Sequence, residues 1–286
     1  MRYSGIHDYL GQGGACASRG AVAILLMEDL CETNSTIRHH LSLGFDHMAV
    51  IGPDALNISP ELLNNVHHVV HDPHAGDGFA AVVTAIADTA PNRWFYYGFN
   101  AEYLFYPFCE SRSIGEMTSF VAEERRDSVL TYVVDLYARD LSEHPDGVAT
   151  DTAYLDKCGY YSHARSRDGK AMERQLDMFG GLRWRFEEHV AQRRRKIDRI
   201  SVFRAHPGLE LRDDCTLSIE EMNTYSSPWH HSLTASIASF RAAKALRTNA
   251  GSSRDIDDFI WHNSEKFDWH SRQLLDLGLM EPGQWF

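Results

Sequence analysis

The sequence lacks the closely spaced cysteines of a disulfide framework or a structural zinc site. Its cysteines are scattered, odd in number and without a CxxC pair: Cys16, Cys31, Cys109, Cys158 and Cys215. Isolated cysteines are typical of a reducing compartment, and no Cys₄ or Cys₂His₂ zinc spacing is present. We therefore expect a cytoplasmic protein that folds without disulfides.

A long apolar run is also missing. No stretch approaches the ~20 apolar residues that cross a bilayer. The first residues, MRYSGIHDYLGQGGACASRG, are polar and glycine-rich, and they lack the charged segment and apolar run of a secretory signal. We expect a soluble protein in which residues 1–20 form a loose N-terminal arm.

Positive charge is scarce. The chain has 28 Lys and Arg against 40 Asp and Glu, which gives a net charge of -12. Such a chain is a poor candidate for binding nucleic acid or an anionic membrane surface unless it has a local basic patch. The one basic run, Arg193 to Lys196, is typical of a solvated helix end, and an anion site is the alternative.

The chain does contain enough apolar sequence for a large core. It has 286 residues, of which 43% are hydrophobic, a size that suits one large domain or one domain with an appendage. No repeat or low-complexity linker marks a second domain. We expect a main domain over residues 21–240 and a helical extension over residues 241–286 that packs on the same domain.

The first hundred residues alternate between strand and helix patterns. Apolar runs predict buried strands over 21–27, 47–53 and 66–72 and from Trp94 onward. Between them, helices are expected over 35–43, with Gly44 ending the helix, from about Pro60, and over 78–88. This alternation predicts an α/β fold with an open, mostly parallel sheet.

Acidic residues follow each of these strands. They are Glu28, Asp54, Asp72 and Glu102. Ligands of open parallel sheets bind outside the carboxyl ends of the strands, near the topological switch point. We therefore expect these acids to gather in one cleft.

The second half is less regular. Residues 123–141 carry apolar side chains at helical spacing and predict an amphipathic helix. Residues 200–205 predict a late strand, and the stretch after the Pro-broken SSPWHH segment predicts a long helix.

The stretch ILLMEDLCETNSTIRHHLSLGFDHMAVIG resembles the opening of family 2 type glycosyltransferases of the GT-A fold, in particular a bacterial group. The matching positions are Glu28, Ile37, His40, Gly44, Phe45 and Asp46. The family continues into Asp-Asn-x-Ser-x-Asp after the second strand, whereas this chain has Gly52-Pro53-Asp54.

A second landmark of the family is a Trp, an apolar strand and then Asp-x-Asp-Glu-Phe-Leu. Here Trp94 matches, and Glu102-Tyr103-Leu104 match Glu-Phe-Leu. The two metal-binding aspartates of the family fall on Phe99 and Ala101. Further on, FGGLRWRFEEH, residues 179–189, resembles the segment that lines the acceptor side in such enzymes.

The resemblance implies a GT-A-like, Rossmann-like sheet flanked by helices, with a helical C-terminal part. It also implies hexosyl transfer from a nucleotide-sugar donor, UDP-linked, to a carbohydrate or glycoconjugate acceptor such as a cell-surface polysaccharide. Such a transfer needs groups that hold the nucleotide and a base that takes a proton from the acceptor hydroxyl. We assign donor contacts to Glu28, Asp54, Glu102, Arg183 and Arg185.

For the base we choose Glu187 or Glu188, with Asp151 behind them. Because adjacent helical residues point to different faces, we expect at most one of the two glutamates to face the pocket.

The resemblance implies a divalent cation, Mn²⁺ or Mg²⁺. Such ions require several oxygen ligands, and with the Asp-x-Asp aspartates absent, Glu102 would need help from His230 or His231. Without a metal, the diphosphate would have to be neutralised by Arg183, Arg185 and the basic run.

Two other functions stay open at this point. One is a catalytically inactive protein of the same fold that serves as a sugar-nucleotide-binding or interaction module. The other is a metal-dependent hydrolase built on HDPHAGD, where His71, Asp72, His74 and Asp77 lie close together in sequence.

Overall fold

The computed structural model describes residues 1–45 and 47–285. Asp46, one of the residues that carry the family resemblance, lies outside the described residues. The chain divides into two compact units that do not follow the expected boundaries at residues 20 and 240. Unit 1 comprises Met1–Tyr103, Cys109–Leu130 and Arg199–Asn223, and unit 2 comprises Leu104–Phe108, Thr131–Asp198 and Thr224–Phe286.

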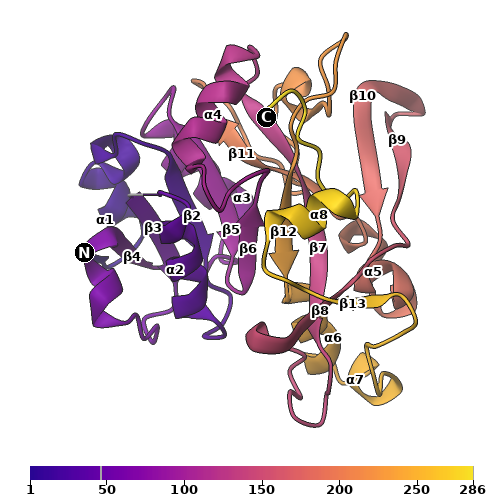
Figure 1. The fold of residues 1–286 in the computed structure, drawn as a ribbon. Coiled ribbons are helices and arrows are strands. Elements are labelled where there is room, and N and C mark those ends of the chain that lie inside the picture. The colour runs from indigo at the N-terminus through magenta and orange to yellow at the C-terminus, as the bar shows by residue number, and fades with distance from the viewer. Residues whose placement is uncertain (46, 286) are drawn as a thin grey trace. The chain divides into compact units, whose positions relative to one another are not determined.

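Unit 1 is built around a mostly parallel sheet. Its strands are β1 (Arg2–Tyr3), β2 (Val22–Leu26), β3 (His47–Gly52), β4 (Val66–Val70), β5 (Trp94–Phe99) and β11 (Asp198–Arg204). They are ordered β1-β4-β3-β2-β5-β11 (Figure 1). The pairs from β1 to β5 are parallel, and β11 runs antiparallel to β5. Strands β2 and β3 are buried at every position, which explains their continuous apolar runs and confirms the four strands expected in this region.

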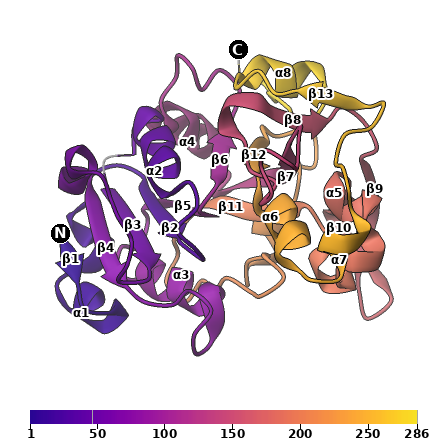
Figure 2. The ribbon, with the colours of Figure 1, turned by 90° about the horizontal axis from the view of Figure 1, so that it is seen from below.

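Helices cover both faces of this sheet. The unit contains α1 (Ile6–Gly11), α2 (Thr33–Ser42), α3 (Gly78–Asp88) and α4 (Ile114–Glu123), with 3₁₀ turns at Gly14–Ala17, Pro60–Asn65 and Glu220–Asn223. On β5, Tyr96 stacks on His40 of α2, whereas Tyr97 and Phe99 contact Phe79 of α3. Because neighbours on a strand point to opposite faces, α2 and α3 lie on opposite sides of the sheet (Figure 2).

Helix α2 ends as its sequence predicts. Gly44 follows the helix with φ of 93°, in the left-handed region that glycine adopts without strain, and its N–H donates to Leu41 O at 3.0 Å. His40, on the same helix, is fully buried, and burial lowers its pKa to about 3. Its ring is therefore neutral at physiological pH and acts as a packing group.

Residues 1–20 form part of the sheet unit instead of a loose arm. Strand β1 pairs with β4, with Arg2 opposite His68. Helix α1 buries Tyr9, whose hydroxyl lies 2.9 Å from His47 Nε2. The aromatic side chains of Tyr3 and Tyr9, packed edge to face at 5.1 Å, give this polar segment the apolar anchor that its average composition conceals.

Unit 2 contains the strands β7 (Ser128–Ala138), β8 (Ala153–Asp156), β12 (Ala235–Ser239), β13 (Ser264–Lys266), β9 (Tyr161–Arg167) and β10 (Lys170–Phe179), and the short β6 (Glu102–Phe105) links the two units along the chain. Strand β12 pairs parallel to β7, and β8 runs antiparallel to both β7 and β13. Strands β9 and β10 form an antiparallel hairpin.

The helical elements of unit 2 are short. They are α5 (Leu182–Arg185), α6 (Arg241–Thr248), α7 (Ser252–Asp255) and α8 (Ser271–Asp276), with 3₁₀ turns at Thr150–Thr152, Glu187–His189 and Gln192–Arg194. The expected helical extension over residues 241–286 is thus a mixture of α6, α7, β13 and α8. The long helix expected after SSPWHH is instead strand β12 followed by α6.

The helix predicted over residues 123–141 is wrong. Most of that segment is β7, a strand of 11 residues that is buried at all but one position. When nearly every residue is apolar, helical spacing is satisfied by chance, and the β-branched and aromatic residues Val129, Thr131 and Tyr132 favour a strand. The helix of this region is α4, which precedes the strand and begins with a capping box at Ser113 and Glu116.

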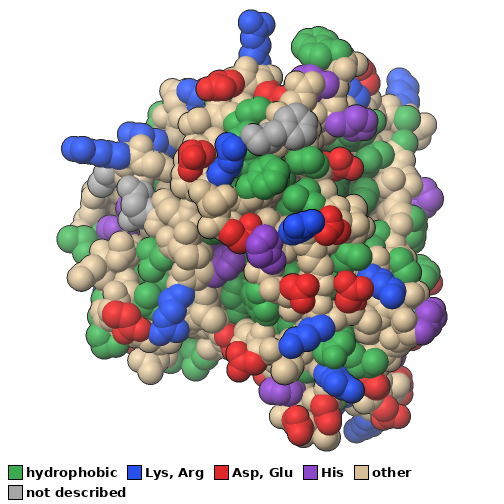
Figure 3. All heavy atoms as spheres, in the orientation of Figure 1, with side chains coloured by type: hydrophobic (Ala, Val, Ile, Leu, Met, Phe, Trp, Pro, Cys, Tyr) green, Lys and Arg blue, Asp and Glu red, His purple; other side chains and the backbone are tan. Residues whose placement is uncertain are grey.

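Charges of both signs are mixed on the face shown in Figure 3, where acidic side chains are interspersed with Lys, Arg and His. Within the described residues, no helix combines the length and the apolar character that crossing a membrane requires.

The capping box of α4 gives a test of the local fold. Ser113 Oγ accepts the Glu116 N–H at 3.3 Å, and Glu116 Oε2 accepts the Ser113 N–H at 2.7 Å. We predict that Ser113→Ala lowers the free energy of unfolding by about 1 kcal/mol, because an N-cap acceptor is lost. Urea unfolding measures the change. Ser119→Ala on the same helix is the control and should be nearly neutral, because Ser119 only bonds back to Gly115 O; equal losses in both variants would contradict the assignment.

Candidate functional site

The strand order of unit 1 contains a topological switch point. From β2 the chain moves outward through β3 to β4, and it then returns through α3 to β5 on the other side of β2. The connections on either side of β2 therefore leave in opposite directions, and open sheets bind ligands outside the carboxyl ends of the strands near such a point. Leu26 and Phe99, which pair across β2 and β5, mark that edge of the sheet.

An open hollow of about 570 Å³ lies beyond the carboxyl ends of β2, β3 and β4. We call it the unit 1 hollow. It is lined by Met27, Glu28, Pro53, Val70, His71, Asp72 and Pro73. Two of the acids expected in a shared cleft, Glu28 and Asp72, are therefore brought together here.

The backbone beneath the unit 1 hollow is tightly packed. The parallel ladder continues past the strand ends, since Met27 N–H donates to Ile51 O at 2.7 Å and His71 N–H to Gly52 O at 3.0 Å. A Cβ on Gly52 would approach Met27 Cβ and Leu56 Cδ1 to 2.7 Å. Glycine at this position thus allows the segments after β2 and β3 to lie against each other.

Glu28 is held at the unit 1 hollow from two sides. Its Oε1 lies 2.7 Å from His74 Nε2, and its side chain is 20% exposed. Its backbone N–H donates to Asn100 Oδ1 at 2.9 Å. Asp72 Oδ1 accepts the His74 N–H at 2.9 Å and so fixes the turn that carries the histidine.

Asn100 is the residue of this site that sequence reasoning missed. Its side chain is fully buried, and its Nδ2 donates to Asp29 Oδ1 at 2.5 Å and to Cys31 O at 2.9 Å. Together with the bond to Glu28 N–H, these contacts tie the end of β5 to the loop after β2. A polar residue at the end of an otherwise apolar strand was the available signal.

Glu102 does not face the unit 1 hollow, and this corrects its expected role in donor and metal binding. Its carboxylate is fully buried and accepts the Phe99 N–H at 2.9 Å and Arg199 Nη2 at 2.6 Å. The Arg199 guanidinium lies over the rings of Tyr97 and Phe99 at 5.4 and 5.6 Å. Burial by itself would lower the pKa of Arg199, but the Glu102 carboxylate raises it above its usual value.

Asp54 is also not part of the hollow lining. It forms an ion pair with Arg2, and the two side chains are 67% and 60% exposed. Exposed pairs of this kind contribute little to stability. The expected cleft of four acids is thus reduced to Glu28 and Asp72.

The residues present do not fit the divalent cation that the family resemblance implies. The positions of the Asp-x-Asp aspartates are taken by Phe99 and Ala101, both buried and apolar. His74, proposed as a ligand within the HDPHAGD segment, is bonded to Glu28. Across residues 1–45 and 47–285, no three His, Cys, Asp or Glu side chains gather in a group that could hold a metal ion.

Unit 2 has an open hollow of its own, of about 530 Å³. We call it the unit 2 hollow. It is lined by Trp184, Arg185, Phe186, Glu187, Glu188 and Trp261. Both glutamates line it, contrary to the expectation of at most one, because they lie on a short 3₁₀ turn without buried residues instead of on the α-helix that the expectation assumed.

Arg185, one of the residues that line the unit 2 hollow, forms an ion pair with the buried Asp156. The Asp156 Oδ1 atom accepts from Tyr137 Oη at 2.6 Å, from Trp261 Nε1 at 2.7 Å and from Arg185 Nη1 at 3.1 Å. Burial raises the pKa of Asp156, although Arg185 opposes this effect. The Arg185 charge is therefore balanced within the protein, and the guanidinium lies over the Trp261 ring at 4.8 Å.

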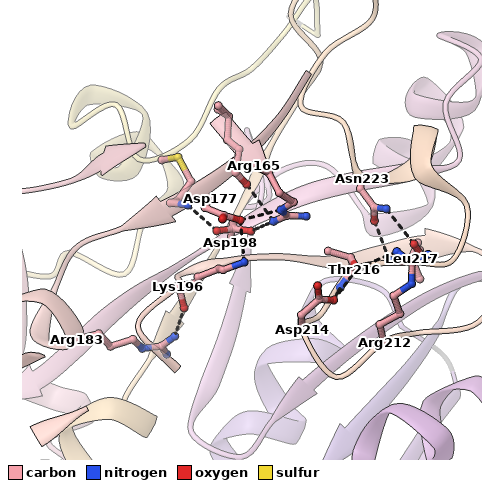
Figure 4. A network of polar contacts seen from close by, with 12 residues as sticks. Arg165, Asp177, Arg183, Lys196, Asp198, Arg212, Asp214, Thr216, Leu217 and Asn223 are labelled. Carbon is pink, nitrogen blue, oxygen red and sulfur yellow. Dashed lines mark hydrogen bonds and ion pairs between the residues drawn. The ribbon is translucent and has the colours of Figure 1, made fainter. Parts of the chain in front are cut away.

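Arg183 and Lys196, the last residue of the basic run, form contacts within unit 2. Arg183 Nε lies 3.3 Å from Asp135 Oδ1. Figure 4 shows its second contact, in which Nη1 donates to Lys196 O at 3.0 Å. Lys196 Nζ donates to Asp177 Oδ1 at 2.9 Å, and Asp177 also binds the buried Arg165. Arg195, bound to Glu187 at 3.0 Å, and Lys196 therefore have structural partners, which favours a structural role for this end of the run over the anion site.

The remaining predicted residues lie elsewhere in unit 2 and do not line its hollow. Asp151 is exposed on the turn at Thr150–Thr152. His230 and His231 lie in the loop before β12, where His231 stacks on Tyr225 and His230 adjoins Trp229.

Comparison with known proteins does not assign a family. No protein family model matches the chain, and no curated protein matches it. The glycosyltransferase resemblance therefore rests on the residues quoted in the sequence analysis and enters below as a proposal.

The Asn100 contacts give a test of how the unit 1 site is built. In Asn100→Asp, a carboxylate oxygen would replace Nδ2 and face the two acceptors Asp29 Oδ1 and Cys31 O. We predict a loss of about 3 kcal/mol in the free energy of unfolding at pH 8.

The loss should shrink as the pH falls. Burial and Asp29 would raise the folded-state pKa of the new carboxyl above its unfolded value, so its cost grows as pH rises and fades as the group takes up a proton. Urea unfolding of wild type and variant at pH 8 and pH 4.5 measures this. Asn92→Asp, on an exposed turn, is the control; a pH-independent loss in Asn100→Asp would contradict the account.

Proposed function

We propose that this protein binds a nucleotide-sugar donor at the unit 1 hollow and transfers the sugar to a carbohydrate acceptor. The observation that carries the proposal is the position of Glu28: a partly exposed carboxylate, fixed by Asn100 and His74, at the switch point of a mostly parallel sheet. Nucleotides are bound at this place in open sheets, where an acid at a strand end accepts hydrogen bonds from the ribose hydroxyls.

The hollow suits the nucleoside part of the donor. Glu28 and Asp72 provide carboxylate oxygens that accept from ribose hydroxyls or from the uracil N–H. Met27, Pro53, Val70 and Pro73 provide apolar surface for the base. A uridine nucleotide is therefore the donor class that we propose.

The unit 2 hollow supports a role toward the acceptor. The exposed Trp184 offers a flat apolar face for a sugar ring, and the neighbouring carboxylates can accept from its hydroxyls. Glu187 Oε2 lies 3.0 Å from Arg195 Nη1, whereas Glu188 Oε1 lies 3.9 Å from its nearest ion-pair partner, His189 Nε2; the two glutamates are 56% and 64% exposed. Because Glu188 is the less tightly paired of the two, it is the base that we propose for taking the proton of the acceptor hydroxyl.

The second candidate is a binding module of the same fold that does not transfer sugar. The buried Glu102–Arg199 pair favours it, because it occupies the carboxylate that we expected to take part in donor and metal binding. The metal-dependent hydrolase has no comparable support, since His74 is bonded to Glu28 and Asp72 to the backbone of the same turn.

Donor binding is tested by calorimetry with UDP. We predict that Glu28→Gln weakens UDP binding at least tenfold, because the neutral amide replaces a carboxylate that accepts charge-assisted hydrogen bonds. The control is Glu123→Gln, an exposed acid at the end of α4 in the same unit. If the two variants bound UDP with equal affinity, the unit 1 hollow would not be the nucleotide site.

Turnover separates the two candidate functions. With UDP-sugars and a panel of oligosaccharides, Glu188→Gln should lower kcat at least 100-fold, because general-base catalysis contributes about 10²–10⁴ in rate. Glu187→Gln, on the same turn, should lower it far less. UDP binding to wild type without release of UDP from any UDP-sugar would instead support the binding module.

A further inference from the structure

The pair formed by Glu102 and Arg199 is enclosed in the core of unit 1. The two side chains are 0% and 5% exposed, and Arg199 Nη2 lies 2.6 Å from Glu102 Oε2. Arg199 Nε donates to Ser201 Oγ at 2.7 Å, and Glu102 also accepts the Phe99 N–H. Both charged groups therefore have partners, and neither is directed to solvent.

A divalent cation at Glu102 would face two obstacles. The cation would need several oxygen ligands. The neighbouring Phe99 and Ala101 have no side-chain oxygen. The Asn100 side chain is already hydrogen-bonded to Glu28, Asp29 and Cys31. The cation would also have to displace Arg199, which would leave a guanidinium buried between Tyr97 and Phe99 without its counter-charge.

We infer that Arg199 is a built-in counter-ion for Glu102 and that nucleotide binding in unit 1 does not use a divalent cation at this carboxylate. The charge that a metal would neutralise is neutralised by the chain itself. The part of the inference that concerns the nucleotide rests on the proposed function, whereas the part that concerns Glu102 and metal does not.

Manganese binding can be measured directly. Free Mn²⁺ is followed by electron paramagnetic resonance during titration of wild type, Glu102→Gln and the exposed control Glu123→Gln. We expect the same binding curve for wild type and Glu102→Gln. A saturable site that is present in wild type and Glu123→Gln but absent from Glu102→Gln would overturn the inference.

Calorimetry with UDP tests the nucleotide part. The dissociation constants in EDTA and in millimolar Mn²⁺ should agree within about twofold, whereas tenfold tighter binding with Mn²⁺, lost in Glu102→Gln, would overturn the inference. If UDP does not bind under either condition, the proposed function fails, and the manganese titration still decides the role of Glu102.

The counter-ion role is tested by a double-mutant cycle in melting temperature. Arg199→Met leaves the Glu102 carboxylate buried alone and should melt well below wild type, and adding Glu102→Gln should recover part of the loss. Arg199→Lys, which keeps the charge, covers the case in which Arg199→Met does not fold, and it should melt between wild type and Arg199→Met. If the changes in melting temperature of Arg199→Met and Glu102→Gln were additive, Arg199 would not be the counter-ion of Glu102.

Discussion

The site in unit 1 depends on one buried amide. Asn100 joins the end of β5 to the loop after β2 through bonds to Glu28 N–H, Asp29 Oδ1 and Cys31 O. The β2–β5 ladder ends at the pair Leu26 and Phe99, with a last backbone bond from Asn100 N–H to Leu26 O at 3.1 Å. Beyond that bond, the Asn100 side chain reaches the loop after β2 and fixes the backbone of Glu28, the acid that lines the hollow. A buried amide that loses its hydrogen-bond partners costs free energy. Any movement that breaks the three Asn100 bonds is therefore opposed by the stability of the fold.

The parts of the fold that follow from local pattern could be predicted from the sequence. Strands β2, β3, β4 and β5 are short apolar runs bounded by polar residues, and their alternation with α2 and α3 indicates a parallel sheet. The place of the site follows from the same rule, which brought Glu28 and Asp72 into one hollow. The strand and helix predictions of this region succeeded because they depend on neighbours in sequence, whereas the expected cleft of four acids contains only two of them.

The failures depend on contacts between residues far apart in sequence. From the sequence, Glu102 is a plausible metal or donor ligand. The structure shows that it is paired with Arg199, and no residue near Glu102 in the sequence indicates this partner. Strand β7 was misread because a strand buried on both faces has no polar alternation to distinguish it from a helix. Residues 1–20 were misread because two tyrosines anchor a segment whose average composition is polar.

The charges at the unit 1 hollow restrict which part of a nucleotide can bind there. Glu28 and Asp72 line it, and their carboxylates would repel a diphosphate unless a cation intervened. With Glu102 already paired to Arg199, the described residues provide no metal group at that carboxylate to supply such a cation. The same carboxylates are good acceptors for hydroxyls and N–H groups, which a nucleoside carries on its ribose and base. The hollow is therefore matched to the neutral end of a nucleotide, and the affinity of a donor should come mainly from its nucleoside.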